Sequence, residues 1–116
     1  MQIISSAQAP VERTPWGSLT WFASGKLGGA QGITVGQCVI LPGCANTLHS
    51  HPNCEEVLHL IQGPILHSFN GEEAPMEPGD TIVIPAGVLH NAKNLGDEEA
   101  VMIISYSSPE RRTEQA

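Results

Sequence analysis

The chain has few basic side chains and few aromatic ones. Five Lys and Arg stand against twelve Asp and Glu in 116 residues, so the formal net charge is −7. A nucleic-acid partner requires a basic face that these residues do not supply, and we therefore expect no nucleic-acid binding. Aromatic residues make up only 4% of the chain, so Val, Ile and Leu must fill most of the core.

Long apolar runs and a regular set of cysteines are also missing. No run approaches the ~20 residues that span a bilayer, and the amino terminus lacks a basic start followed by an apolar stretch. We therefore expect no membrane span and a cytoplasmic location. The three cysteines are an odd number without a C-x-x-C pair, which argues against a disulfide framework.

Helical periodicity is absent, whereas turn residues are frequent, with twelve Gly and nine Pro. Residues 1–15 are predicted to form an arm or an edge strand, and the polar residues 107–116 a frayed tail. Between them, strand-like segments separated by turns predict an all-β fold, an antiparallel β-sandwich or barrel. The predicted strands cover residues 18–22, 33–41, 49–51, 56–61, 65–69, 81–84, 90–94 and 100–106.

Four side chains that can bind a metal ion occur in two short sequence patterns, called frames below, which also contain glycine and proline at fixed positions. Because side chains alternate along a strand, His49 and His51 should share one face. Glu56 should enter the next strand facing the interior, with Glu55 facing out, and His90 should arrive from another strand. Three imidazoles and one carboxylate suit iron, manganese, zinc, nickel or copper. The frames are Gly43, His49-x-His51, Glu56, Gly63 and then Gly79, Pro85-x-Gly87, His90, Asn94.

These two frames match the two sequence motifs of the cupin family, and residues 33–106 resemble a small single-domain cupin. The resemblance implies a jelly-roll β-barrel of two antiparallel sheets in one domain over residues 1–116. It also implies one divalent transition metal ion held by His49, His51, Glu56 and His90, and a homodimer. Cupins include dioxygenases, isomerases, decarboxylases, lyases, polyketide cyclases and storage proteins, so the fold and the ligand set do not choose the reaction.

Several other residues have two or more interpretations. His67 shares an apolar face with Ile65 and Phe69, where it could carry protons or be a core histidine bonded to a backbone carbonyl. Cys54 is a small buried residue, a pocket thiol or a further ligand. Tyr106 and Trp21 line a pocket or simply pack in their strands. His59, like Val57 and Ile61, has the parity of the outer face, which suits a subunit interface.

The sequence favours a metal-dependent enzyme that acts on a small organic substrate. A dioxygenase-like oxidoreductase, with Glu56 taking a proton, is slightly preferred. The alternatives are a non-redox isomerase, lyase or cyclase in which His67 moves protons, and a binding or sensing module without turnover. No cationic side chain occupies a predicted inward strand position, so no arginine clamp on the substrate is expected. The cations are Arg13, Lys26, Lys93, Arg111 and Arg112.

Overall fold

The computed structural model describes residues 1–116 and is built almost entirely of strands. A short 3-10 helix, η1 (Ser6–Gln8), precedes them. None of the helical segments is long and apolar enough to cross a membrane. The strands are β1 (Val11–Thr14), β2 (Gly17–Ala23), β3 (Thr34–Ile40), β4 (His49–Ser50), β5 (Glu56–Gln62), β6 (Ile65–Phe69), β7 (Glu72–Met76), β8 (Thr81–Ile84), β9 (His90–Asn94), β10 (Ala100–Tyr106) and β11 (Glu114–Gln115).

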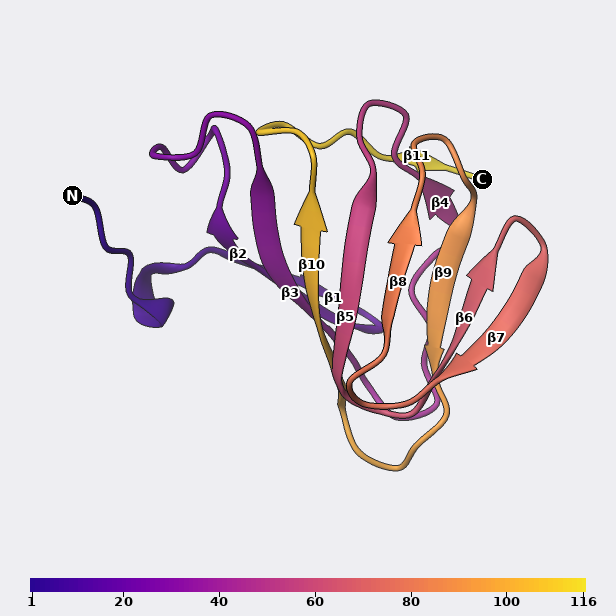
Figure 1. The fold of residues 1–116 in the computed structure, drawn as a ribbon. Helices are drawn as coiled ribbons and strands as arrows, with labels where there is room; N and C mark the ends of the chain where they lie inside the picture. The colour runs from indigo at the N-terminus through magenta and orange to yellow at the C-terminus, as the bar shows by residue number, and fades with distance from the viewer.

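The strands form two antiparallel sheets that face each other across the core (Figure 1). The larger sheet has the order β1-β2-β3-β10-β5-β8, and the smaller has the order β11-β4-β9-β6-β7. Neighbouring strands are often distant in sequence, as where β10 pairs with both β3 and β5. The predicted all-β sandwich of jelly-roll type is therefore confirmed.

Alternating burial along the central strands defines the core. Both β3 and β10 bury every second residue, as expected for strands with one face toward a core. Gly36 of β3 is required by close packing, because a Cβ there would lie 2.6 Å from Cε3 of Trp21. Asn94 is 1% exposed, and its amide donates to the carbonyl oxygens of Ile40 (2.9 Å) and Glu98 (2.7 Å).

The sequence did not predict β7, which follows the hairpin turn at Asn70 and Gly71. These two turn residues have positive φ, 50° and 87°, as the Asn-Gly pair favours. The strand itself reads EEAPM, and four of its five residues are exposed. It lies at the edge of the smaller sheet, where Pro75 is tolerated and no apolar alternation is needed.

Both chain ends are more ordered than a polar composition suggests. Residues 11–14 form β1, the edge strand of the larger sheet, which was one of the two alternatives. The prediction of a frayed carboxyl-terminal tail is wrong, because β11 pairs with β4 through Glu114↔Ser50 and Gln115↔His49. Figure 1 shows the tail crossing the end of the sandwich to reach β4. The tail thus lies beside the first histidines of the metal motif.

The outer face of β5 and β8 carries exposed apolar side chains. Val57, Ile61 and Val83 are 37%, 51% and 54% exposed. His59 lies on the same face, as its parity predicted, and its Nδ1 is 2.8 Å from the hydroxyl of Thr81. A homodimer that covers this face stays a prediction.

Candidate metal centre

The structure brings together the four side chains that the spacing singled out. His49 lies on β4, directly opposite His90 on β9, and His51 follows two residues later. Glu56 reaches the same point from β5 in the other sheet. One donor atom from each residue lies within 4.8 Å of all the others. His51, Glu56 and His90 are at most 3% exposed, so the cluster is a buried junction of the two sheets.

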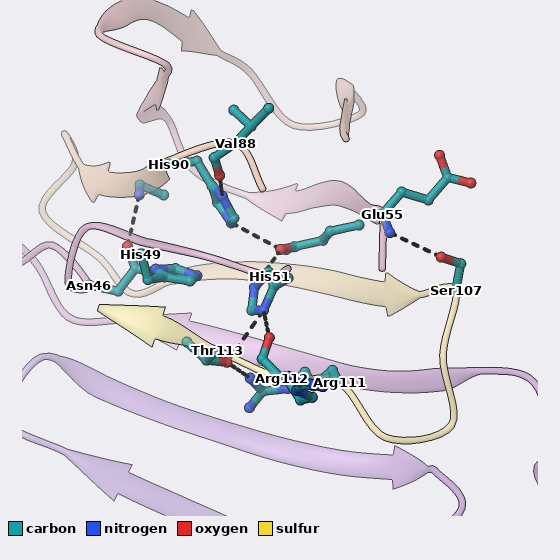
Figure 2. Close-up of polar contacts among 12 residues, drawn as sticks. Asn46, His49, His51, Glu55, Val88, His90, Ser107, Arg111, Arg112 and Thr113 are labelled. Atoms are coloured by element: carbon teal, nitrogen blue, oxygen red, sulfur yellow. Dashed lines mark hydrogen bonds and ion pairs between the residues drawn. The ribbon is translucent and has the colours of Figure 1, made fainter. Parts of the chain in front are cut away.

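Each imidazole of the cluster is held through its Nδ1 atom, as Figure 2 shows for His51 and His90. A carbonyl oxygen can only accept a hydrogen bond, so each Nδ1 must donate the proton. A neutral imidazole that donates through Nδ1 has a lone pair on Nε2, which is the atom that binds a metal ion. The acceptors are the carbonyl oxygens of Thr47 for His49 (2.6 Å), Arg112 for His51 (2.9 Å) and Val88 for His90 (3.0 Å).

The Nε2 atoms face a carboxylate. Glu56 Oε1 lies 3.0 Å from His90 Nε2, a hydrogen bond when that nitrogen is protonated, and 3.2 Å from His51 Nε2, which has no hydrogen-bond partner. Two lone pairs at this distance in a dry site repel each other unless a proton or a cation lies between them. The cluster therefore fits a divalent metal ion, and its nitrogen and oxygen donors suit a transition metal.

The electrostatics of the cluster keep the carboxylate ionised. Burial opposes the charge on Glu56, but contacts with His51 and His90 outweigh it and lower the pKa to about 2. Burial also opposes the charge on His90, yet the hydrogen bond to Glu56 and its negative charge raise the pKa of His90. The pKa of His49 falls to about 4, chiefly because burial disfavours the imidazolium. Glu56 is thus a negative charge at every physiological pH and a weak proton acceptor.

A cavity of about 260 Å³ opens beside the cluster. Its lining includes the apolar side chains of Leu58, Met102 and Ile104 together with the cluster and other polar groups. Such a mixture of an apolar wall and a few converging polar groups is typical of a small-molecule site. The lining comprises Glu12, Trp16, Leu19, Cys38, Asn46, Thr47, His49, His51, Glu56, Leu58, His67, His90, Asn91, Ala92, Met102, Ile104, Tyr106, Arg111, Thr113 and Gln115.

His67 lines this cavity from β6 and is only 2% exposed. Its ring stacks on that of His90, with centroids 5.8 Å apart and planes 10° from parallel. Neither of its ring nitrogens has a partner that meets hydrogen-bond distance and angle, although the backbone of Ser68 lies close enough to favour the charged form. The roles of His67 as a proton carrier and as a core histidine therefore both stay predictions. Burial, with a further contribution from the nearby His90, lowers the pKa of His67 to about 4. The side chain is therefore a neutral imidazole with both nitrogens available.

Of the other candidate site residues considered in the sequence, one lines the cavity and the rest do not. Cys54 is buried but is not among the four converging residues. Tyr106 lines the cavity and meets the ring of His51 edge to face at 4.9 Å, whereas Trp21 packs behind it at 6.2 Å. Glu55 is exposed, as its parity predicted, and its hydrogen bonds are backbone ones with Ser107: its N–H donates to the Ser107 hydroxyl and its carbonyl accepts from the Ser107 N–H.

The carboxyl-terminal tail contributes residues that the sequence did not reveal. Arg111, Thr113 and Gln115 line the cavity, so a cation reaches the site from the tail rather than from one of the inward strand positions that the sequence analysis considered. The carbonyl of Arg112 orients His51 from 61 positions away along the chain. No local pattern signals these contacts, because they depend on the pairing of β11 with β4.

Comparison with known proteins agrees with this geometry. A family model described as "Cupin domain" matches residues 36–106. Germin-like protein 3-8 of Oryza sativa subsp. japonica is 34% identical over 66% of this chain and 36% of its own length. Tetracenomycin polyketide synthase protein TcmJ of Streptomyces glaucescens is 27% identical over 91% of this chain and 70% of its own. The chain spans only about two-fifths of the germin-like and auxin-binding relatives that it matches.

Among solved structures, oxalate decarboxylase of Lactobacillus farciminis in its formate complex superposes with a TM-score of 0.84. It is 25% identical and covers 94% of this chain and 34% of its own. The family match spans more than half of the 116 residues and contains all four converging side chains. With both motifs, the two-sheet sandwich and the histidine–glutamate cluster in agreement, the chain belongs to the cupin family.

Proposed function

We propose that the protein is a metal-dependent enzyme that moves a proton on a small substrate bearing a carbonyl or enol group. His67 is the observation that carries this proposal. It is a buried imidazole without a hydrogen-bond partner, and it lines the same cavity as the four metal-competent residues. An unpartnered buried polar group is costly, so its retention beside a candidate metal centre favours a role in the reaction.

His49, His51, Glu56 and His90 would hold the metal ion, which when bound supplies a Lewis acid that polarises a substrate oxygen. His67 accepts a proton at one ring nitrogen and returns it elsewhere on the substrate, as a general base and then a general acid. The low pKa of Glu56 makes it a poorer proton acceptor than His67, so we assign proton transfer to the imidazole. Leu58, Met102 and Ile104 keep water from the reacting group.

Two relatives are in line with a carbonyl-bearing substrate. TcmJ and the polyketide synthase protein CurC of Streptomyces cyaneus are both named for polyketide synthesis, and CurC is 32% identical over 68% of this chain. A polyketide chain carries carbonyl and enol groups, on which proton transfer is the elementary step of isomerisation and cyclisation. The proposed substrate is therefore a small oxygenated carbon compound of this type.

Proton exchange without oxygen tests the proposal. Zinc-loaded protein is incubated anaerobically in D₂O with a panel of linear and cyclic β-dicarbonyl compounds, and deuterium incorporation is followed by NMR. We expect exchange above the buffer rate, and a loss of about 10²–10⁴-fold in His67→Gln with unchanged metal content. His59→Gln, which removes a histidine from the outer face, is the matched control and should keep full activity.

Oxygen chemistry is the second candidate, because three imidazoles and a carboxylate can also hold a redox-active ion with coordination positions to spare. It predicts consumption of oxygen by iron-loaded protein, no reaction with zinc, and a small effect of His67→Gln. That set of results would overturn the proton-transfer proposal.

A further inference from the structure

Arg111 occupies a position in the cavity that neither the sequence motifs nor the metal-competent cluster explain. It arrives from the carboxyl-terminal tail, between the carbonyl of Arg112 that orients His51 and the end of β10 (Figure 2). Its guanidinium carbon lies 4.3 Å from the ring centroid of Trp21 and 5.4 Å from that of Tyr106. The two aromatic faces hold the cation in place at the cavity wall.

The guanidinium has most of its hydrogen-bonding capacity unused. An arginine carries five N–H donors, and within the chain only Nη1 of Arg111 donates, to the hydroxyl of Thr113 at 2.6 Å. Arg111 makes no ion pair, although Glu12 and Glu56 line the same cavity. The other N–H donors of Arg111 have no partner within the chain, and the planar fork of a guanidinium matches a carboxylate.

The cavity contains a positive side chain although the chain as a whole is negatively charged. The protein carries a formal net charge of −7, yet the cavity holds a half-buried arginine beside a cluster suited to a divalent cation. With a divalent ion bound, the ion and Arg111 would outweigh the carboxylates of Glu12 and Glu56 by one positive charge, which favours an anionic ligand over a neutral one.

We propose that Arg111 is a specificity-determining residue that binds a carboxylate group of the substrate, which makes the substrate class an oxygenated carboxylic acid. The inference rests on the proposed function in so far as the same cavity is the substrate site. It adds a second point of attachment, so that the reacting carbon is placed between Arg111, His67 and the metal-competent cluster.

Ligand binding tests this without any turnover. Isothermal titration calorimetry of benzoate and of its neutral isostere benzamide is carried out on protein with the metal that it carries when purified. We expect wild-type protein to bind benzoate more tightly than benzamide, and Arg111→Gln to weaken benzoate about tenfold or more while leaving benzamide unchanged. Arg111→Lys, which keeps the charge without the planar fork, should give an intermediate affinity.

Arg13→Gln is the matched control, since it removes the same charge from an exposed position whose side chain does not line the cavity. Equal weakening by Arg111→Gln and Arg13→Gln, equal weakening of both ligands, or no binding of benzoate to the wild type overturns the inference. Metal content and melting temperature establish that each variant is folded. Because proton exchange is measured separately, failure of the carboxylate site and failure of the proposed function give different results.

Discussion

Each imidazole of the metal-competent cluster is aimed by a backbone carbonyl, and two of the three carbonyls are local. His49 and His90 each donate to the residue two positions earlier, so a short extended segment provides both the ligand and its orientation. The spacing in the sequence predicts all three histidines as ligands, but not the carbonyls that orient them. His51 instead depends on the carbonyl of Arg112, which only the completed fold brings near. Long-range partners of this kind are what spacing cannot predict.

The two adjacent glutamates provide a direct test of the ligand set. Glu56 is 3% exposed and its carboxylate faces two imidazoles, whereas Glu55 is exposed and has the opposite strand parity. We expect Glu56→Gln to lower metal affinity by at least about 10–100-fold. Removal of a residue that only hydrogen-bonds a metal ligand already costs about that much, and Glu56 would be a ligand itself. Glu55→Gln removes the same charge one residue away and should bind metal as the wild type does.

Metal content by mass spectrometry, and competition with a coloured chelator, measure both variants. Equal loss in the two variants would show that net charge rather than coordination governs binding, and the assignment of Glu56 as a ligand would then be withdrawn.

Among the elements, strands marked by an apolar pattern or by the histidine motifs were predictable, and the other polar strands were not. β6, β8, β9 and β10 have the predicted bounds. β6, β8 and β10 carry apolar residues between clear turns, whereas β9 reads HNAKN and was placed by the motif that contains His90 and Asn94. β7 was missed because its exposed acidic residues give no alternation, and β11 because a two-residue polar strand has no pattern at all. Both are edge strands, whose pairing rather than composition keeps them in place.

Packing between β2 and β3 predicts a sharp difference between two glycines. A Cβ at Gly36 would lie 2.6 Å from the Trp21 ring and 2.7 Å from the carbonyl oxygen of Thr20, and the backbone atom cannot rotate away. Gly36→Ala should therefore destabilise the fold by about 1–3 kcal/mol through overpacking. Gly32 has open space around it, so Gly32→Ala should change stability by no more than about 0.5 kcal/mol.

Urea denaturation of both variants measures the two free energies of unfolding. A Gly36→Ala protein as stable as the wild type would mean that β2 and β3 separate readily, and that Trp21 does not hold its position behind the cavity.

At the scale of the whole molecule, the candidate metal centre joins the two sheets. His49 and His90 belong to the smaller sheet and Glu56 to the larger, so an ion bound between them would link β4 and β9 to β5. The unfolded chain has no such arrangement of ligands, and binding energy therefore becomes folding energy. The tail adds a further link, because β11 pairs with β4 while residues 110 and 112 bond to Asn53.

Removal of the metal should therefore lower the melting temperature, and the size of the effect should depend on pH. A ligand that binds only the native state adds about 4 kcal/mol at a thousandfold excess over its dissociation constant. Protons compete for the imidazole nitrogens, and His90, whose pKa is raised, is protonated first as the pH falls. We expect a chelator to lower the melting temperature strongly at pH 7.5 and much less at pH 5, as measured by differential scanning calorimetry.

The metal-free protein should itself lose stability on acidification, and the sign follows from the pKa shifts. The pKa values of His49 and His67 are lowered to about 4, so the unfolded chain binds more protons as the pH falls from about 6.5 to 4, and stability drops. Glu56, with a pKa lowered to about 2, adds to the loss below about pH 4.5. His90 opposes this trend, because its raised pKa gives stability that is present at low pH and lost as the pH rises through the folded-state pKa. Two histidines with a lowered pKa outweigh one with a raised pKa, so the melting temperature of metal-free protein should fall between pH 7.5 and pH 5. A higher melting temperature at pH 5 than at pH 7.5 would contradict the burial of His49 and His67 as neutral imidazoles.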